Sequence, residues 1–155
     1  MKIAIIAGTF FPYAGGVQVE THNMANKLVK KGNKVDVYVF TKPKLSNNLY
    51  NIIKLNYFYL SFLYILKYFI NFPLKIVFKS FKFNFIDLEY EIYHFHFLNF
   101  KSLILVEFLK FFKKKVIVTF HGADIQIKKK INYGFRINNK YNNYLEQIVK
   151  EVDAF

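Results

Sequence analysis

The sequence predicts an α/β fold in which a parallel sheet of the Rossmann type is flanked by helices. Short apolar runs alternate along the chain with longer segments whose apolar residues recur at helical spacing. The 155 residues are enough for one domain with a buried core. The chain contains no cysteine, which excludes disulfide frameworks and thiolate metal sites.

The first predicted unit is a strand, a turn and a helix. Ile3–Ala7 is an apolar run typical of a strand that is covered on both faces. Gly15 and Gly16 form the turn, and apolar residues then recur every three or four positions as far as Val29. A glycine turn at a helix N-terminus exposes backbone N–H groups that bind anions. Gly15 and Gly16 are therefore candidate binding residues.

The second strand is predicted in VDVYVF, at residues 35–40, where valines alternate with other residues. Strand, helix and strand make a βαβ unit with a parallel pair. A polar loop follows, in which Pro43 is a stop signal.

Residues 49–85 are dense in aromatic and aliphatic side chains. We expect a helix at Leu55–Leu66, and Pro73 should end or bend whatever precedes it. A membrane-spanning helix needs about 20 apolar residues, and lysines interrupt every window of that length. The segment is expected either to lie in a membrane interface or to form an ordinary buried helix pair. The interface candidates are Tyr57, Phe58, Phe62, Lys67 and Phe69.

The remaining elements continue the alternation. A third strand is expected at EIYHFHF, residues 91–97, and a crossover helix at 101–114. A fourth strand at 116–120 ends abruptly at His121-Gly122. Residues 128–143 read as a solvated loop, residues 144–150 as a helix, and VDAF as the start of another strand.

Three histidines fall at one edge of this predicted sheet. In an open parallel sheet, ligands bind beyond the carboxyl ends of the strands. His94 and His96 lie near the end of the third strand, and His121 and Asp124 follow the fourth. An imidazole there can donate to a sugar hydroxyl or to a developing charge, so His121 is the catalytic candidate. The i, i+2 histidines lack a nearby third ligand, and we expect no metal.

Three segments carry a family resemblance. GTFFPYAGGVQVETHNMANKLVKKGNKVDVYVFT resembles the opening of retaining GT-B glycosyltransferases of family 4, with its F-P-x-x-G-G turn. EIYHFHF resembles the D-V-V-H-x-H strand of that family, and VIVTFHGADI resembles its V-x-T-x-H-G-x-D segment. The three stand in the order that the family has, over about the whole chain.

The resemblance implies two Rossmann-like domains with a cleft between them, of which residues 1–155 are the N-terminal, acceptor-side domain. Gly15 and Gly16 would then approach the donor diphosphate or an acceptor phosphate. His121 would position the transferred sugar, His96 would contribute to binding, and Asp124 would contact the acceptor or order its loop. The donor is a nucleotide-sugar, and this class needs no metal or other cofactor.

The sequence also departs from the family. Gln18 stands where the family often has Glu, and Glu20 is judged a poor replacement on another helical face. From the resemblance we expect that residues 1–155 end before the sheet of this domain is complete and that they lack the C-terminal donor-binding domain. We therefore expect the isolated chain to be inactive, as a gene fragment, a truncated product, or half of a split enzyme whose other domain acts in cis or in trans.

The net charge of +13 and the 21% of aromatic residues predict phosphate-rich partners, although AT-rich codon usage also favours these residues.

The expected acceptor is a cell-envelope glycan or a lipid-linked precursor. The expected location is the cytoplasm, peripheral on the inner face of the cytoplasmic membrane. One alternative is an inactive membrane-surface remnant of a transferase. A nucleic-acid-binding module is a weaker alternative, because no signature of one is present.

Overall fold

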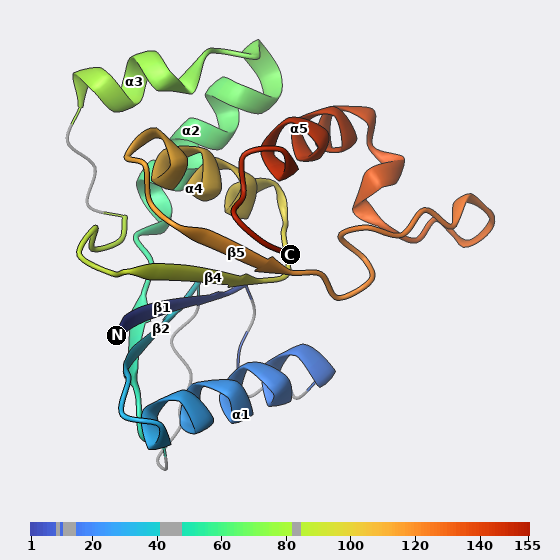
Figure 1. Cartoon of the computed structure of the whole chain (residues 1–155). Coiled ribbons are helices and arrows are strands. Elements are labelled where there is room, and N and C mark those ends of the chain that lie inside the picture. The colour runs from blue at the N-terminus through green and yellow to red at the C-terminus, as the bar shows by residue number, and fades with distance from the viewer. Residues whose placement is uncertain (9, 11–14, 41–47, 82–84) are drawn as a thin grey trace.

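The computed structural model describes residues 1–8, 10, 15–40, 48–81 and 85–155, except for the side chain of Tyr57. It contains a five-stranded sheet in the order β3-β2-β1-β4-β5 (Figure 1). The strands are β1 (Lys2–Ala7), β2 (Lys34–Val39), β3 (Asn51–Lys54), β4 (Ile92–His96) and β5 (Val116–Thr119). Every neighbouring pair is parallel. The predicted Rossmann-like fold is confirmed.

Helices cover both faces of the sheet. Helix α1 (Gly16–Lys30) lies against one face (Figure 1). On the other side lie α2 (Tyr57–Ile70), α3 (Leu74–Ser80), α4 (Phe100–Phe111) and α5 (Asn139–Val149). Two 3₁₀ turns, at Lys129–Ile131 and Phe135–Ile137, precede α5. Among the described residues, no helix combines the length and the apolar character that crossing a membrane requires.

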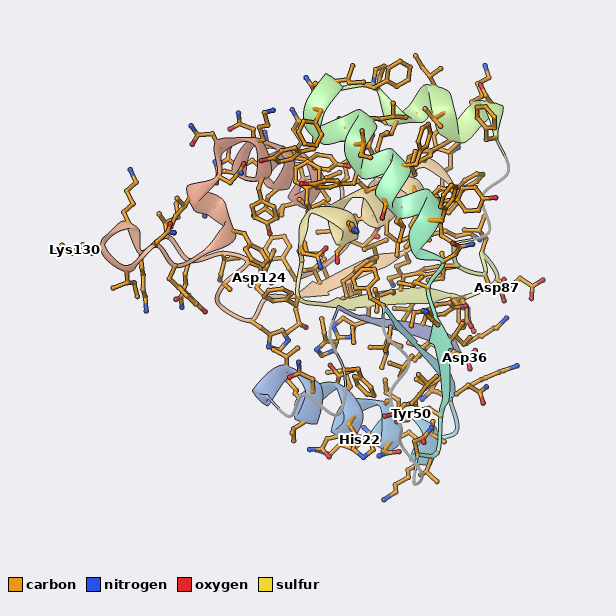
Figure 2. All side chains as sticks on the ribbon, turned by 180° about the vertical axis from the view of Figure 1, so that it is seen from behind. His22, Asp36, Tyr50, Asp87, Asp124 and Lys130 are labelled. Atoms are coloured by element: carbon orange, nitrogen blue, oxygen red, sulfur yellow. The ribbon has the colours of Figure 1, made fainter. Side chains whose placement is uncertain are left out.

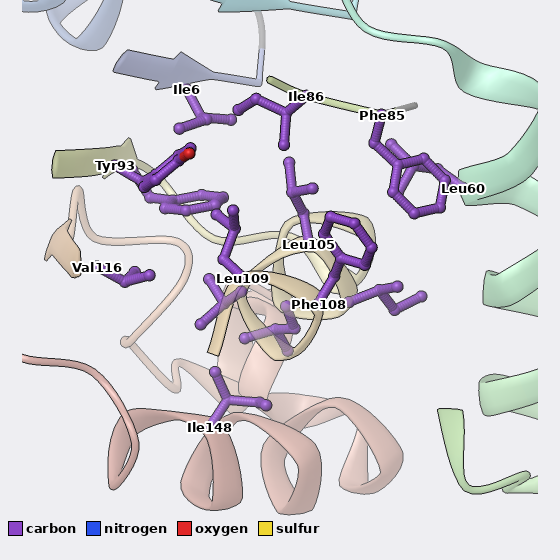
Figure 3. Close-up of a cluster of buried hydrophobic side chains, with 14 of the residues drawn as sticks. Ile6, Leu60, Phe85, Ile86, Tyr93, Leu105, Phe108, Leu109, Val116 and Ile148 are labelled. Atoms are coloured by element: carbon purple, nitrogen blue, oxygen red, sulfur yellow. The ribbon is translucent and has the colours of Figure 1, made fainter. Parts of the chain in front are cut away.

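The alternation of side chains along β1 divides the core in two. Ile3, Ile5 and Ala7 pack toward α1 with the valines of β2. Ala4 and Ile6 point to the opposite face and join a larger cluster with residues of α2, α3, α4 and α5. Figure 3 shows Ile6 together with Leu105 and Phe108 of α4 in this cluster. Because both faces of β1 are buried, its sequence is apolar without interruption.

Three elements differ from the prediction. Strand β3 was not predicted, and it pairs with β2 at the edge of the sheet. Helix α5 begins five residues earlier than the predicted residue 144, because the Asn138 side chain accepts from the Tyr141 N–H and caps the helix. The predicted last strand is a single parallel bridge between Ile117 and Ala154. The predicted loop at 41–47 lies outside the described residues.

Candidate functional site

The carboxyl ends of the strands bring the predicted site residues to one edge. Ala7 of β1 pairs with Val39 on one side and with His96 on the other, and His96 pairs with Thr119 of β5. The segments that leave these strand ends carry His121 and Asp124. The N-terminus of α1 reaches the same edge, because the Glu20 carboxylate contacts His121.

His96, His121 and Glu20 form a chain of contacts. His96 Nδ1 lies 3.2 Å from His121 Nε2, and the two rings are stacked with their centroids 5.4 Å apart. On its other side, His121 Nδ1 lies 3.6 Å from Glu20 Oε2. His96 is fully buried. The side chain of His121 is 11% exposed and that of Glu20 is 50% exposed, so this series of contacts runs from the core to the surface.

Burial sets the charge of the two histidines on β4. It lowers the pKa of His94 to about 4, with a smaller contribution from His121. Burial also lowers the pKa of His96 to about 3, assisted by His94 and His121. His94 Nε2 lies 2.8 Å from Thr119 Oγ1. Both rings are therefore neutral at pH 7, and the partly buried His94 is held by its contact with Thr119.

Asp124 joins the loops that follow β4 and β5. Its carboxylate is fully buried and accepts the N–H of His121 at 3.0 Å and the N–H of Leu98 at 3.2 Å. The Tyr141 hydroxyl donates to the Leu98 carbonyl at 2.6 Å, which ties α5 to the same point. Asp124 thus links the two loops, and Figure 2 shows it at the opposite end of the sheet from Asp36 and Asp87.

The glycine turn is described only at Gly15 and Gly16. Gly15 has an extended backbone and is the N-cap of α1. Its N–H donates to Gln18 Oε1 at 3.0 Å, so Gln18 serves the cap. A Cβ built on Gly16 meets no atom within 4 Å, which leaves open space at the first turn of the helix. The rest of the motif, residues 11–14, lies outside the described part of the chain.

Glu20 is the site residue that sequence reasoning missed. It lies four positions after Gly16, so both belong to the same face of α1. A groove along this helix is lined by Gly16, Glu20 and Asn23 among others. The four-residue spacing between Gly16 and Glu20 could have indicated that Glu20 lies beside the glycine turn. The comparison with the family drew attention to position 18 instead.

The same three residues offer a possible metal-ligand set. One ligand atom each from Glu20, His96 and His121 lie within 4.8 Å of one another. A metal here would take the Nδ1 lone pair of His96 and leave the proton of His96 on Nε2. That atom is buried and has no hydrogen-bond partner in the described structure. Imidazoles that bind metals almost always donate their other N–H, so these residues do not fit a metal site.

Exposed apolar residues line one side of α2. Phe58, Phe62, Ile65 and Phe69 follow one another at helical spacing and are 77%, 51%, 51% and 67% exposed. Ile76 of α3 and Phe81 just beyond it are exposed as well. We call these six residues the outer face. Lys67, a predicted interface residue, turns away from it, because its Nζ lies 4.8 Å from the centre of the Tyr144 ring.

The inner side of α2 borders a cavity of about 540 Å³. Tyr64 and Tyr68 of α2 line it, together with Phe135 and Tyr141. Phe135 packs edge-on against Phe97 at the end of β4, with ring centroids 5.3 Å apart. Tyr141 connects the cavity to the candidate site, because it lines the cavity and also donates a hydrogen bond to the loop that follows β4. Asp124 joins that loop to the backbone of His121.

Comparison with known proteins gives one matching family model and a similar solved structure. The family model described as Glycosyltransferase Family 4 matches residues 14–155. Among solved structures, the chain is similar to one described as "Structure of MT0777", with 13% identity and a TM-score of 0.46. That match covers 99% of this chain and 82% of the other. A search of curated proteins finds no significant match.

Proposed function

This chain belongs to glycosyltransferase family 4, and we propose that it forms the acceptor-side domain of a retaining enzyme that uses a nucleotide-sugar. The observation that carries the proposal is the convergence of His121, His96 and Gly16 at the carboxyl edge of the parallel sheet. Ligands bind at this edge in open α/β folds. The C-terminal domain that the resemblance implies would complete the cleft.

Each site residue has a proposed part. The open first turn of α1 at Gly16 takes a phosphate group of the donor or the acceptor, through backbone N–H groups and the positive end of the helix. His121 is the catalytic residue, because its partly exposed ring donates a hydrogen bond to the transferred sugar. His96 acts behind it, and Asp124 fixes the position of the His121 backbone.

No metal enters this proposal. The leaving diphosphate is stabilised by the helix dipole and by basic groups. The described histidine cluster does not fit a metal, since coordination strands a proton on the buried His96 Nε2.

The test is binding followed by ¹⁵N NMR. Adding inorganic pyrophosphate or a UDP-hexose to the chain should shift the amide signal of Gly16, and the UDP-hexose should also shift the His121 ring signals. Gly16→Val should weaken both ligands by about tenfold or more, because the new side chain fills the space beside the N–H groups. Ile131→Ala, on an exposed turn away from this groove, is the control. Shifts confined to other parts of the chain would contradict the proposal.

A second function is favoured by the outer face. We propose that it docks on an anionic membrane surface, whether or not the chain takes part in transfer, at the inner face of the cytoplasmic membrane. Exposed apolar patches of this kind mark interaction sites. Lys75 and Lys79 are exposed on α3 beside Ile76, and such lysines favour anionic headgroups over a neutral protein partner. A lipid-linked acceptor would then meet the cavity on the inner side of α2.

Vesicle flotation tests this second function. The chain should float with vesicles of phosphatidylglycerol and much less with phosphatidylcholine alone. Phe62→Ser combined with Phe69→Ser should reduce binding by about tenfold or more, because two exposed rings no longer enter the interface. Ile131→Ser, exposed on a distant turn, is the control. Unchanged flotation of the double variant would show that the outer face does not bind the membrane. Binding to oligonucleotides instead of vesicles would favour the nucleic-acid alternative.

A further inference from the structure

One buried atom, His96 Nε2, determines which ring nitrogens of His96 and His121 carry a proton. A neutral imidazole carries one N–H and one lone pair. His96 Nε2 is buried, and the described residues supply it with no partner. A buried N–H without an acceptor is rarer and costlier than an unused acceptor. The proton of His96 therefore sits on Nδ1 and is donated to His121 Nε2, 3.2 Å away.

This order fixes the state of the next ring. His121 Nε2 accepts from His96, so the neutral His121 ring carries its proton on Nδ1. That nitrogen faces Glu20 Oε2 at 3.6 Å. The site thus presents a donor and a charged acceptor side by side at its exposed end.

The separation is too long for a direct hydrogen bond of ordinary strength. Two groups bridged by one hydroxyl oxygen lie about 4–5 Å apart, because each hydrogen bond spans about 2.8 Å. The Glu20 side chain must therefore move outward slightly to admit such an oxygen. A hydroxyl oxygen accepts from an N–H and donates its own proton to a carboxylate. Glu20 is half exposed and lies on the helix face of Gly16, so its side chain can adjust to such a group.

We propose that Glu20 is a ligand-binding residue, which accepts the proton of a sugar hydroxyl whose oxygen accepts the Nδ1–H of His121. The proposal rests on the proposed transferase function and adds a specificity residue to it. A hydrogen bond to a charged group discriminates strongly against a ligand that lacks the hydroxyl, because the carboxylate is then left without a donor. The function of Glu20 differs from that of Gln18, which caps the helix.

The first test needs no ligand. Imidazole ¹⁵N spectra of the chain distinguish protonated from unprotonated ring nitrogens. We expect His96, and His121 in its neutral form, both to carry the ring proton on Nδ1. A proton on His96 Nε2 would overturn the proposal, whatever the outcome of the donor-binding experiment.

The second test follows the His121 ring during titration with methyl α-hexopyranosides of glucose, galactose and mannose. At least one should shift the His121 Nδ1–H signal. Glu20→Ala should weaken that ligand by about tenfold or more, with Glu20→Gln between the two. Glu151→Gln, an exposed carboxylate elsewhere, is the matched control, and amide spectra verify folding.

Equal affinity of the wild type and Glu20→Ala would reject the role of Glu20 and leave the sugar site intact. A chain that binds none of the three sugars would also overturn the proposal. The transferase function is judged separately, by the Gly16 response to pyrophosphate and UDP-hexose.

Discussion

At the scale of single residues, His94 and His96 of β4 make stability depend on pH. His94 and His96 have pKa values of about 4 and about 3, below the ordinary 6.5. Below pH 6.5 these two histidines therefore bind protons in the unfolded chain but stay neutral in the folded chain. Their contribution to stability is present above pH 6.5 and is lost as the pH falls toward the folded pKa values of about 4 for His94 and about 3 for His96.

The free energy of unfolding should fall between pH 6.5 and pH 5 by on the order of 2–3 kcal/mol for the pair. Urea denaturation at several pH values measures this. His94→Gln removes one titrating group and keeps a polar side chain beside Thr119, so the slope should drop to about half. A slope equal to that of the wild type would show that His94 titrates normally in the folded protein.

Residue patterns predicted part of the site. The position of His94, His96 and His121 at strand ends was readable, because parallel strands bring their carboxyl ends to one edge. The link from Glu20 to His121 was not, since it depends on how α1 lies over the sheet and no local pattern records that. His22 lies outside this site: its Nδ1 is 2.7 Å from the Tyr50 hydroxyl, and Figure 2 shows both residues on one side of the molecule.

At the scale of elements, α4 and α5 are joined by a buried polar pair. The Tyr144 hydroxyl donates to Glu107, which is only 7% exposed. Burial, more than the neighbouring Glu107 carboxylate, raises the pKa of Tyr144 well above its usual value. Removing the donor leaves a carboxylate in the core with no described hydrogen-bond partner.

Tyr144→Phe should lower the free energy of unfolding by about 2–3 kcal/mol. Tyr144→Phe combined with Glu107→Leu should recover most of that loss, because no unpaired carboxylate remains. Tyr133→Phe, on an exposed turn, should change stability by less than about 0.5 kcal/mol. Chemical denaturation of the three variants provides the comparison, and a double variant no more stable than Tyr144→Phe alone would refute this account.

The elements themselves differ in how far the sequence predicts them. β1 and β2 are buried over nearly their whole length, and their apolar runs show it. β3 has only four residues, with exposed ends, and exists because it adds to the edge of β2. A segment this short carries too little pattern of its own. Helix α5 was predicted late because its first turn is made of polar residues that read as loop.

At the scale of the whole molecule, the excess of positive charge opposes compaction. A net charge of +13 on 155 residues repels itself, and the repulsion is strongest at low ionic strength. Sodium chloride shortens the screening length from about 30 Å at 0.01 M to about 8 Å at 0.15 M. Salt should therefore stabilise the fold.

Raising sodium chloride over this range should increase stability by about 1 kcal/mol and the melting midpoint by about 2–4 °C. Differential scanning calorimetry measures the change. A variant in which Lys128, Lys129 and Lys130 are replaced by Gln should respond less, since these exposed residues sit together on one turn. A midpoint that falls with salt would mean that attractive ion pairs dominate.

The buried Asp124 carboxylate also has a mechanical consequence. It holds the backbone after β4 and the backbone after β5, and Tyr141 fastens α5 to the same point. These three segments cannot shift independently without breaking the hydrogen bonds to Asp124, which are charge-assisted, or the bond from Tyr141 to Leu98. A displacement of α5 would therefore move the Leu98 carbonyl and, through Asp124, the backbone that carries the His121 ring.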